Sequence, residues 1–593
     1  MKTSKYIVAI LLVSLGITTQ VLAQDTIRHR SVSVEREYRP VIHDAGKINS
    51  IPQVLEPTGV KSPAEFSDFN LPLNAAYNVR PLPAAELVGE KHTNANPGYA
   101  RLGFGNYLNT LADFAYPIIS STDTRLDFSL NHLATFDPTQ MHTTTKANLS
   151  FDMIINTFDL YAAVGGGHEY LRYYGNYFNG SDSALNINTL IPKYGQSIYV
   201  EKDRAGVINT PLMYSLNSLA TDPIGDTFWR FNMLAGVRSL PQATDLRYQA
   251  ELQYRVFNSA NGIKEKVVHT VAGFSSPSQD NRLGIGFELY NMAYSSTKIP
   301  DFNFWKSYSV LALNPYYSIE RPEYKVRLGL KSSFSFVHGK FYNPSADISA
   351  EWKAVPEYMT VYGGLTGDYQ VNTLDKIDAE NPYVYSDLRV KDTNAPVELY
   401  AGIKLKPVYN LLLDAYLDYK QFDNQYFFVN KGYSLITSPA GMPQSDTTLY
   451  SNRFNVVYSN ASRVKLGFRA DYNLHKRINV EFKWAYNSWN VDTQDHAWNM
   501  PEYESQFNTN VRVTDNFSVS ANVYYEGGRF AKLGEVAVPM HDKVDINLGA
   551  AYSYLNWLTV FGKINNLISN KYQNYYGYDV QGANVMVGAA FNF

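Results

Sequence analysis

The chain has 593 residues, a formal net charge of −3 at pH 7, and no cysteine. Its 52 basic and 55 acidic residues nearly balance, which argues against a nucleic-acid partner, because such a partner calls for a basic surface. Without cysteine, the chain can form neither a disulfide framework nor a lipid-modified cysteine after a leader peptide. No segment approaches the roughly 20 consecutive apolar residues of a membrane-spanning helix, so we expect no helical membrane spans.

The N-terminus has the pattern of a secretory signal peptide. Lys2 and Lys5 precede an apolar core over residues 7–16, and small and apolar residues end the segment at Ala23. This order of a basic start, a short apolar core and a small-residue site is typical of a cleavable leader. We therefore predict that residues 1–23 are removed and that the mature chain begins at Gln24.

The next segment, residues 24–97, is rich in proline. Proline breaks both helices and strands, so we expect an extended arm in the periplasm or in a lumen rather than a folded domain. The prolines are Pro40, Pro52, Pro57, Pro63, Pro72, Pro81, Pro83 and Pro97.

From Gly98 to Phe593 the chain breaks into alternating apolar and polar runs separated by turn residues. About 22 such runs can be counted, each near the roughly 9–11 residues of a tilted membrane strand. In residues 544–554, for example, apolar side chains alternate with Asp545, and residues 517–526 behave likewise and end at Glu526. Carboxylates are costly toward lipid but not in a watered lumen, so the polar face is predicted to be the interior.

The lengths of the connections give an independent test. If the first strand runs outward from the periplasm, connections after even-numbered strands should be short periplasmic turns, and the others longer external loops. Short connections are predicted at residues 156–157, 241–244, 321–323, 356–358, 475–476, 514–516 and 555–556. Long connections are predicted at residues 170–227, 373–396, 429–453, 491–503, 531–543 and 570–582. Two external connections, residues 105–108 and 338–340, break the rule by being short.

Composition agrees with this architecture. The chain has 47 tyrosines and only 7 tryptophans, and this excess of amphipathic rings fits aromatic girdles at the two membrane interfaces. The alternative is a tyrosine-rich soluble β-sandwich, which the alternating loop lengths do not favour. The predicted fold is therefore all-β: a transmembrane antiparallel β-barrel of about 22 strands with short periplasmic turns and long extracellular loops.

The last strand ends the chain with an aromatic residue. From Ala583 to Phe593 the apolar residues alternate without interruption against small or polar ones. A terminal phenylalanine is the usual sorting mark of bacterial outer-membrane barrels, and this resemblance implies contact with the barrel assembly machinery through the strand that ends at Phe593.

The C-terminal stretch of residues 544–593 resembles the end of TonB-dependent receptor barrels. The resemblance rests on Asn566-Leu567, Lys571-Tyr572, Gly577-Tyr578 and Gly582 before the terminal strand, and it covers residues 98–593. Members of this family carry a plug of more than a hundred residues before the barrel, and residues 24–97 are too few for one. The layout is similar to the plugless receptor-like barrels of Bacteroidetes-type Gram-negative bacteria. Residues 31–35 could lend TonB an added strand, although an extended linker is the simpler interpretation.

Several local patterns suggest chemistry without establishing it. Residues 165–169 combine three glycines with His168 and Glu169, but lack the context of a phosphate loop, so bends in a strand are the favoured interpretation. No second histidine lies at metal-ligand spacing from His168. Asp182-Ser183-Ala184 resembles a short O-glycosylation signal of Bacteroidetes-type exported proteins. A signal of only three residues often matches a sequence by chance. There is no Gly-x-Ser-x-Gly elbow, so a serine hydrolase is not favoured.

Two external loops carry further candidates. An acidic loop could hold calcium, but its spacing matches no calcium loop, so a solvated external face is the favoured interpretation. An aromatic group could stack on a sugar or an apolar ligand, but aromatics there more often form the outer girdle. The acidic residues are Asp375, Asp378, Glu380, Asp387 and Asp392, and the second group is Lys420, Phe422, Tyr426, Phe427 and Phe428.

The sequence thus predicts a barrel of the outer membrane, surrounded by lipid, that takes part in transport of a solute. The alternative is a structural or assembly component of an outer-membrane complex, with an outer-membrane hydrolase third. We expect no enzyme activity, no cofactor and no metal, and no catalytic or binding residue is assigned.

Overall fold

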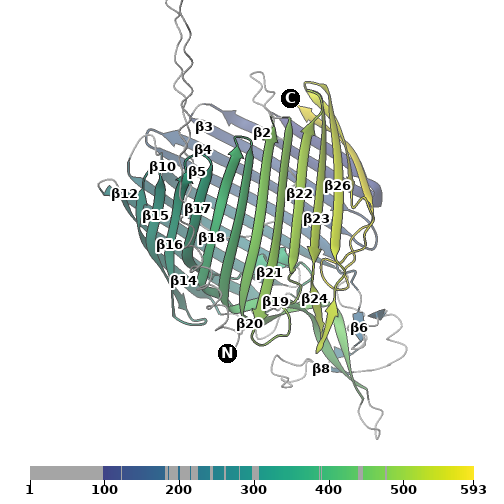
Figure 1. Ribbon diagram of the computed structural model, residues 1–593. Helices are drawn as coiled ribbons and strands as arrows, with labels where there is room; N and C mark the ends of the chain where they lie inside the picture. The colour runs from purple at the N-terminus through teal and green to yellow at the C-terminus, as the bar shows by residue number, and fades with distance from the viewer. Residues whose placement is uncertain are drawn as a thin grey trace, which may run out of the picture. The chain divides into compact units, whose positions relative to one another are not determined.

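In the computed structural model the chain forms a closed antiparallel β-barrel (Figure 1). The structure describes residues 98–593 except 122, 176, 180–183, 186–197, 201–213, 216–224, 241–244, 260–261, 279–280, 297–305, 386–387, 389, 438–444 and 475–476. The predicted leader at residues 1–23 and the arm at residues 24–97 therefore lie outside the described residues, as do Asp182 and Ser183. No helix in the described part of the chain is long and apolar enough to cross a membrane.

Within the described residues the main sheet contains 26 strands, of which four short ones, β6 to β9, lie outside the wall, leaving 22 in the closed ring. The wall strands are β1 Tyr99–Gly105, β2 Asn109–Ser120, β3 Thr124–Thr135, β4 His142–Ile155, β5 Phe158–Arg172, β10 Gly225–Ser239, β11 Arg247–Ser259, β12 Ile263–Ser278, β13 Asn281–Ser296, β14 Tyr308–Glu320, β15 Tyr324–Phe336, β16 Tyr342–Val355, β17 Met359–Gln370, β18 Thr393–Val408, β19 Leu411–Thr437, β20 Ser445–Leu474, β21 Ile478–Val491, β22 Tyr503–Arg512, β23 Phe517–Gly527, β26 Lys543–Leu555, β27 Leu558–Asn565 and β28 Asn584–Asn592.

The remaining elements lie in the connections. They are the 3-10 turn η2 Asn106–Leu108, the short strands β6 Tyr177–Asn179, β7 Ala184–Leu185, β8 Ile198–Val200 and β9 Tyr214–Ser215, the helix α4 Leu374–Glu380, and a separate hairpin of β24 Phe530–Leu533 and β25 Val536–Pro539. All of these elements fall in connections at one end of the barrel.

The first and last strands close the ring. β1 pairs with β28 in antiparallel register from Tyr99 opposite Asn592 to Gly105 opposite Met586. Each other wall strand pairs with the wall strand that precedes it in the chain, so the order is that of an up-and-down barrel. The all-β barrel predicted from the alternating runs is confirmed, which excludes the soluble sandwich.

The predicted parity of the connections holds for most of them. A further external connection, between β11 and β12, is short, and the connection predicted at residues 429–453 is largely strand, because β19 runs to Thr437 and β20 begins at Ser445. Strand pairs such as β4–β5 and β26–β27 are joined by two-residue turns at one end, whereas the helix and the extra hairpin lie in the connections at the other. The short external connections at residues 105–108 and 338–340 are present as hairpin ends, so no strand was miscounted. Because outer-membrane barrels have short periplasmic turns, the end with the short turns is the periplasmic one. The turns at residues 241–244 and 475–476 themselves lie outside the described residues.

The two faces of the wall differ as the alternation predicts. On β10, the side chains of Trp229, Phe231 and Met233 are exposed on the outside, whereas Arg230 and Asn232 point into the lumen. This apolar outer face is the surface that a barrel presents to lipid. Together with the size of the closed ring, it makes the protein an outer-membrane barrel.

Many luminal tyrosines lie flat on glycines of the neighbouring strand. A Cβ atom built on Gly236 or Gly402 would overlap the ring of Tyr161 or Tyr362, respectively. An aromatic ring over a cross-strand glycine covers exposed backbone and fixes the register of the two strands. Part of the tyrosine excess therefore lies inside the barrel, while others, such as Tyr554, are exposed on the outside as a girdle requires.

Candidate functional site

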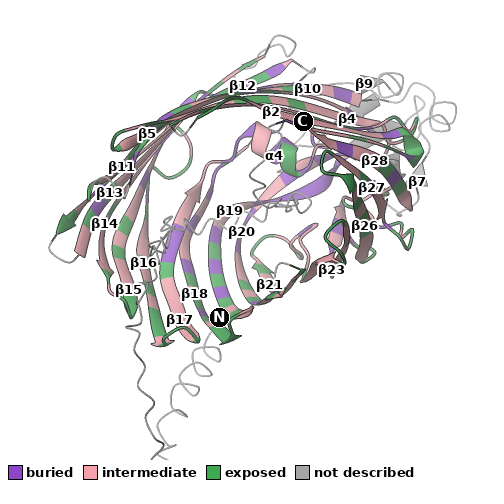
Figure 2. Cartoon of the chain, turned by 90° about the horizontal axis from the view of Figure 1, so that it is seen from above, coloured by how far each residue is buried: buried purple, intermediate pink, exposed green. Residues whose placement is uncertain are grey.

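The connection between β17 and β18 folds inward, into the ring of strands (Figure 2). Its helix α4 lies inside the ring of strands when the barrel is seen from above (Figure 2). We call residues Asn372 to Tyr385 the strap. At its start, Thr373 accepts a hydrogen bond from the Lys376 N–H at 3.1 Å and so caps α4.

The beginning of α4 is held by a carboxylate from the wall. Glu265 on β12 accepts hydrogen bonds from the backbone N–H groups of Leu374 at 2.7 Å and Asp375 at 3.2 Å. Only 1% of Glu265 is exposed. The first N–H groups of a helix have no partner within the helix, so this carboxylate satisfies two of them.

Arg230 on β10 connects the strap to two strands of the wall. Its Nε donates to Asp375 at 2.7 Å, and its two terminal nitrogens donate to Asp378 and, at 2.5 Å, to Glu169 on β5. His142 on β4 contacts the other oxygen of Glu169 at 2.9 Å. A planar guanidinium with five donors suits such a junction, in which each carboxylate accepts from a different nitrogen.

Burial opposes ionisation within this junction. Asp378 is 4% exposed, and burial raises its pKa well above the usual range of aspartate, while Arg230 acts in the opposite direction. A carboxylate so deeply buried is retained only because its charge or its proton has a partner. The junction is therefore a fastening point rather than a solvated surface.

The other end of the strap pairs with β20 through the backbone. Val384 forms a parallel bridge with Phe454, in which the Tyr385 N–H donates to the Phe454 carbonyl at 2.9 Å and the Phe454 N–H donates to the Tyr383 carbonyl at 3.0 Å. Arg453 donates to the Val384 carbonyl at 2.8 Å. Its guanidinium also lies 4.3 Å and 4.4 Å from the ring centroids of Tyr173 and Tyr385.

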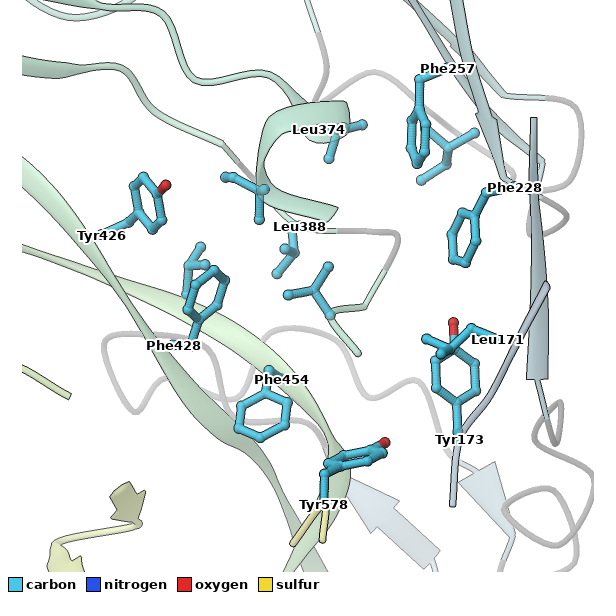
Figure 3. Close-up of a cluster of buried hydrophobic side chains, with 14 residues drawn as sticks. Leu171, Tyr173, Phe228, Phe257, Leu374, Leu388, Tyr426, Phe428, Phe454 and Tyr578 are labelled. Atoms are coloured by element: carbon cyan, nitrogen blue, oxygen red, sulfur yellow. The ribbon is translucent and has the colours of Figure 1, made fainter. Parts of the chain in front are cut away.

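A hydrophobic cluster fills the space beneath and around the strap (Figure 3). Leu374 and Ile377 of α4 belong to it together with side chains from opposite walls of the barrel. Ile377 and Phe454 are fully buried. The wall members are Leu171, Phe228, Phe257 and Ile263 on one side and Tyr426, Phe428, Phe454 and Val456 on the other, and Tyr173 follows the end of β5.

The last external connection, residues 566–583, covers the strap. Tyr575 donates to the Glu380 carbonyl at 2.7 Å, and the ring of Tyr578 stacks on Tyr383 with centroids 3.6 Å apart. Tyr578 is 1% exposed. The Gly577-Tyr578 pair, one element of the C-terminal pattern found in the sequence, thus contacts the strap.

The strap returns to the wall through a buried carboxylate. Asp392 accepts hydrogen bonds from Tyr308 at 2.9 Å, Tyr369 at 3.1 Å and the Asn372 N–H at 3.0 Å. Burial raises the pKa of Asp392. Asn372 also donates to Thr393 at 2.9 Å, so the two ends of the connection are tied together.

The acidic loop is therefore not the solvated external face that its composition suggested. Asp375, Asp378 and Asp392 make internal contacts, and the side chain of Glu380 accepts a hydrogen bond from Tyr426. Asp387 lies outside the described residues. In the part of the chain that the structure describes, no cluster of three or more His, Asp or Glu is arranged to hold a metal ion.

The aromatic group near residue 425 is not an outer girdle either. Lys420, Phe422, Tyr426, Phe427 and Phe428 are all less than a tenth exposed. Lys420 donates to Glu398 at 2.8 Å, and the aromatic rings belong to two hydrophobic clusters at the extracellular end. They are part of the packing that supports the strap and its surroundings.

The glycines of residues 165–167 lie within strand β5, as expected, and form no phosphate loop. A Cβ atom on Gly165 would overlap the side-chain amide of Asn148, so this glycine allows close packing of luminal side chains. His168 packs on Trp229 with ring centroids 4.4 Å apart, while Glu169 joins Arg230.

Sequence reasoning missed the two arginines of the site. Arg230 and Arg453 are both in strands near the extracellular end, and both are far in sequence from the strap they contact. Arg230 occupies a polar, luminal position in an alternating run of residues. This position was the one sequence signal that could have identified Arg230 as part of the site.

Comparison with known proteins supports the barrel architecture. No family model matches the chain, and no curated protein does. Solved structures do match: the ferric-catecholate import receptor Fiu from Escherichia coli K12, at a TM-score of 0.57 and 11% identity, covers 84% of this chain and 82% of its own. A ferric enterobactin receptor (PfeA) variant from Pseudomonas aeruginosa matches at a TM-score of 0.56 and 12% identity, over 84% of this chain and 80% of that one.

The ferripyoverdine receptor of the outer membrane of Pseudomonas aeruginosa, bound to ferripyoverdine, is also similar. The TM-score is 0.56 at 10% identity, and the match covers 84% of this chain and 71% of that chain. At these identities the likeness is one of fold. The resemblance to TonB-dependent receptor barrels is thus supported at the level of architecture, and the protein is an outer-membrane β-barrel with the fold of these receptors.

Proposed function

We propose that this protein takes part in the passage of a solute across the outer membrane, with the strap closing the extracellular mouth of the barrel. The observation that carries the proposal is that one external connection is folded into a polar lumen and fastened to opposite walls, at Arg230 and at Phe454. The fold, shared with import receptors, supports a role in transport rather than catalysis.

Polar side chains along the wall favour a polar solute. At the periplasmic end, Arg469 pairs with Asp471 at 2.8 Å and with Glu481 at 3.1 Å, and Lys483 pairs with Glu481 at 2.7 Å. Neighbouring opposite charges favour neither cations nor anions strongly. We leave the solute unnamed for this reason.

Two protein partners belong to the same proposal. The strand that ends at Phe593 would contact the barrel assembly machinery, and residues 24–97 would offer TonB or another periplasmic protein an extended segment. We further propose that this segment is an extended arm without a folded plug, and that the barrel is a plugless receptor-like barrel of the Bacteroidetes type.

Conductance in a planar lipid bilayer tests the proposal. The purified full-length protein is compared with a variant in which residues 374–388 are replaced by a Gly-Ser linker and with one that lacks residues 25–96. Passage predicts clear single-channel conductance from the first variant. Conductance that appears only after removal of residues 25–96 would make the arm, not the strap, the gate.

A second function is favoured by the depth at which the strap is buried. A strap with fully buried Ile377 and a network of aromatic rings also suits a barrel that stays closed and anchors other envelope proteins. This scaffold role predicts no conductance from any variant and a stable protein partner after extraction in mild detergent. That pair of results would overturn the transport proposal.

A further inference from the structure

Besides the Glu265 carboxylate at the start of α4, two docks of different chemistry hold the strap. The first, which we call the ionic dock, consists of Asp375 and Asp378 on Arg230. The second, the backbone dock, consists of residues 383–385 paired with Phe454. The two ends of the connection between β17 and β18 are joined separately, by hydrogen bonds from Asn372 to Asp392 and to Thr393.

In the ionic dock Arg230 and Asp375 are partly open to solvent, whereas the Asp378 side chain is buried. The Arg230 and Asp375 side chains are 24% and 26% exposed, and Arg230 also serves Glu169, a residue of the wall. If Asp375 and Asp378 leave, Arg230 keeps Glu169 as a carboxylate partner, although Glu265 of the wall loses the N–H groups of Leu374 and Asp375. Removal of Arg230, in contrast, leaves Asp378 buried without its cation, which is strongly unfavourable.

In the backbone dock, the main-chain groups of the strap have no second partner comparable to the Glu169 carboxylate that Arg230 keeps. The hydrogen bonds of this dock join main-chain groups, and Arg453, which supports the Val384 carbonyl, is 6% exposed. Buried main-chain groups that lose their partners are costly, so this pairing resists separation.

We propose that the strap opens at one end only: α4 leaves the wall of β5, β10 and β12 when the ionic dock is broken, while residues 383–385 stay paired with β20. This inference rests on the proposed function, since it describes how the closed mouth would open. Arg230 is then the latch, and the bridge between Val384 and Phe454 is the fixed end about which α4 moves. Burial of Leu374 and Ile377 keeps the strap closed while the latch holds.

Cysteine accessibility tests the order of release directly. The chain has no cysteine, so Ile377→Cys and Val384→Cys each introduce a single thiol, at positions that are 0% and 6% exposed. The full-length protein in detergent micelles is treated with a bulky polyethylene glycol maleimide, and labelling is followed by gel shift. Both thiols should react slowly in the parent protein.

In the Arg230→Gln background, Ile377→Cys should label at least about tenfold faster, because local opening controls the rate. Val384→Cys should remain as slow as in the parent. Arg238→Gln is the matched control, since Arg238 lies on the same strand and pairs with Asp159 at 2.6 Å. That variant should leave both rates unchanged.

A second variant guards against misfolding of the first. Asp375→Asn with Asp378→Asn removes the charges from the strap and leaves the wall intact, and it should also release Ile377→Cys selectively. Protection of Ile377→Cys in both latch variants would overturn the proposal, as would equal release of Val384→Cys.

Conductance of the same variants separates this inference from the proposed function. Selective release of Ile377→Cys without conductance would support the order of opening and contradict solute passage. Conductance from the parent protein while both thiols stay protected would support passage and show that the strap is not its gate.

Discussion

Gly98 and Phe593 exchange two backbone hydrogen bonds across the seam where the barrel closes. The Gly98 N–H donates to the Phe593 carbonyl at 2.6 Å, and the Phe593 N–H donates to the Gly98 carbonyl at 2.9 Å. The Phe593 ring stacks on Tyr116 with centroids 6.3 Å apart. A Cβ atom on Gly98 would lie 2.5 Å from this ring, so the glycine makes room for the terminal residue. The last residue of the chain therefore completes the closure.

Removal of the Phe593 side chain should weaken this closure. Phe593→Ala loses the contacts with Tyr116 and Phe114, and we expect a cost of about 1–2 kcal/mol, below the roughly 3–5 kcal/mol of a fully buried phenylalanine, because the ring is half exposed. The measurement is the fraction that migrates as a compact, heat-modifiable band on a detergent gel. Deletion of Phe593 should reduce that fraction further, and unchanged migration of both variants would show that the seam does not depend on it.

The glycines beneath luminal tyrosines should not accept a side chain. In Gly467→Ala the new Cβ would overlap the ring of Tyr416, and overpacking of this kind costs about 1–3 kcal/mol. The unfolding temperature of the compact band measures the loss. Adding Tyr416→Ala should recover part of it, since the second change removes the overlap.

Gly562→Ala provides the matched control for this prediction. Gly562 also lies in a wall strand, but a Cβ atom there would meet nothing within 4 Å. We expect an unchanged unfolding temperature. A loss equal to that of Gly467→Ala would mean that backbone freedom, not the overlying ring, explains the glycines.

The barrel was accessible from the sequence because its signals are local. A period of two along each strand and the two-residue turns, such as the one with Asn156 in a left-handed conformation (φ 50°), are fixed by neighbouring residues. The strap was not accessible, since its contacts join Asp375 to Arg230 and Val384 to Phe454 across large sequence separations. An acidic loop that is buried against the wall and an acidic loop that is solvated have the same composition. Only the three-dimensional closure of the ring decides which one meets an arginine.

The strap should dock more tightly at acidic pH. Burial raises the pKa of Asp392, which faces Tyr308, Tyr369 and the more distant His338. A group with a raised pKa in the docked state stabilises docking below its ordinary pKa, and this contribution is lost as the pH rises through the raised value. Labelling of Ile377→Cys, corrected for thiolate content, should therefore accelerate with rising pH.

Asp392→Asn is the variant that isolates this effect. Asparagine cannot ionise but still accepts hydrogen bonds through its carbonyl, so the pH dependence should become shallower. An identical pH profile in Asp392→Asn and the parent would assign the dependence to the other carboxylates of the strap.

Arg453 should control the backbone dock as Arg230 controls the ionic one. Arg453→Met fills a similar volume but leaves the buried Val384 carbonyl without this donor, at a cost of about 1–3 kcal/mol. The guanidinium also stacks between Tyr173 and Tyr385, a geometry that a flexible lysine reproduces poorly, so Arg453→Lys should recover only part of the loss. In Arg453→Met we expect labelling of Val384→Cys to accelerate, unlike in Arg230→Gln. Because Arg230 still holds α4 through Asp375 and Asp378, Ile377→Cys should stay protected in this variant. If Val384→Cys stays protected in Arg453→Met, the main-chain pairing with Phe454 holds the strap without help from the arginine.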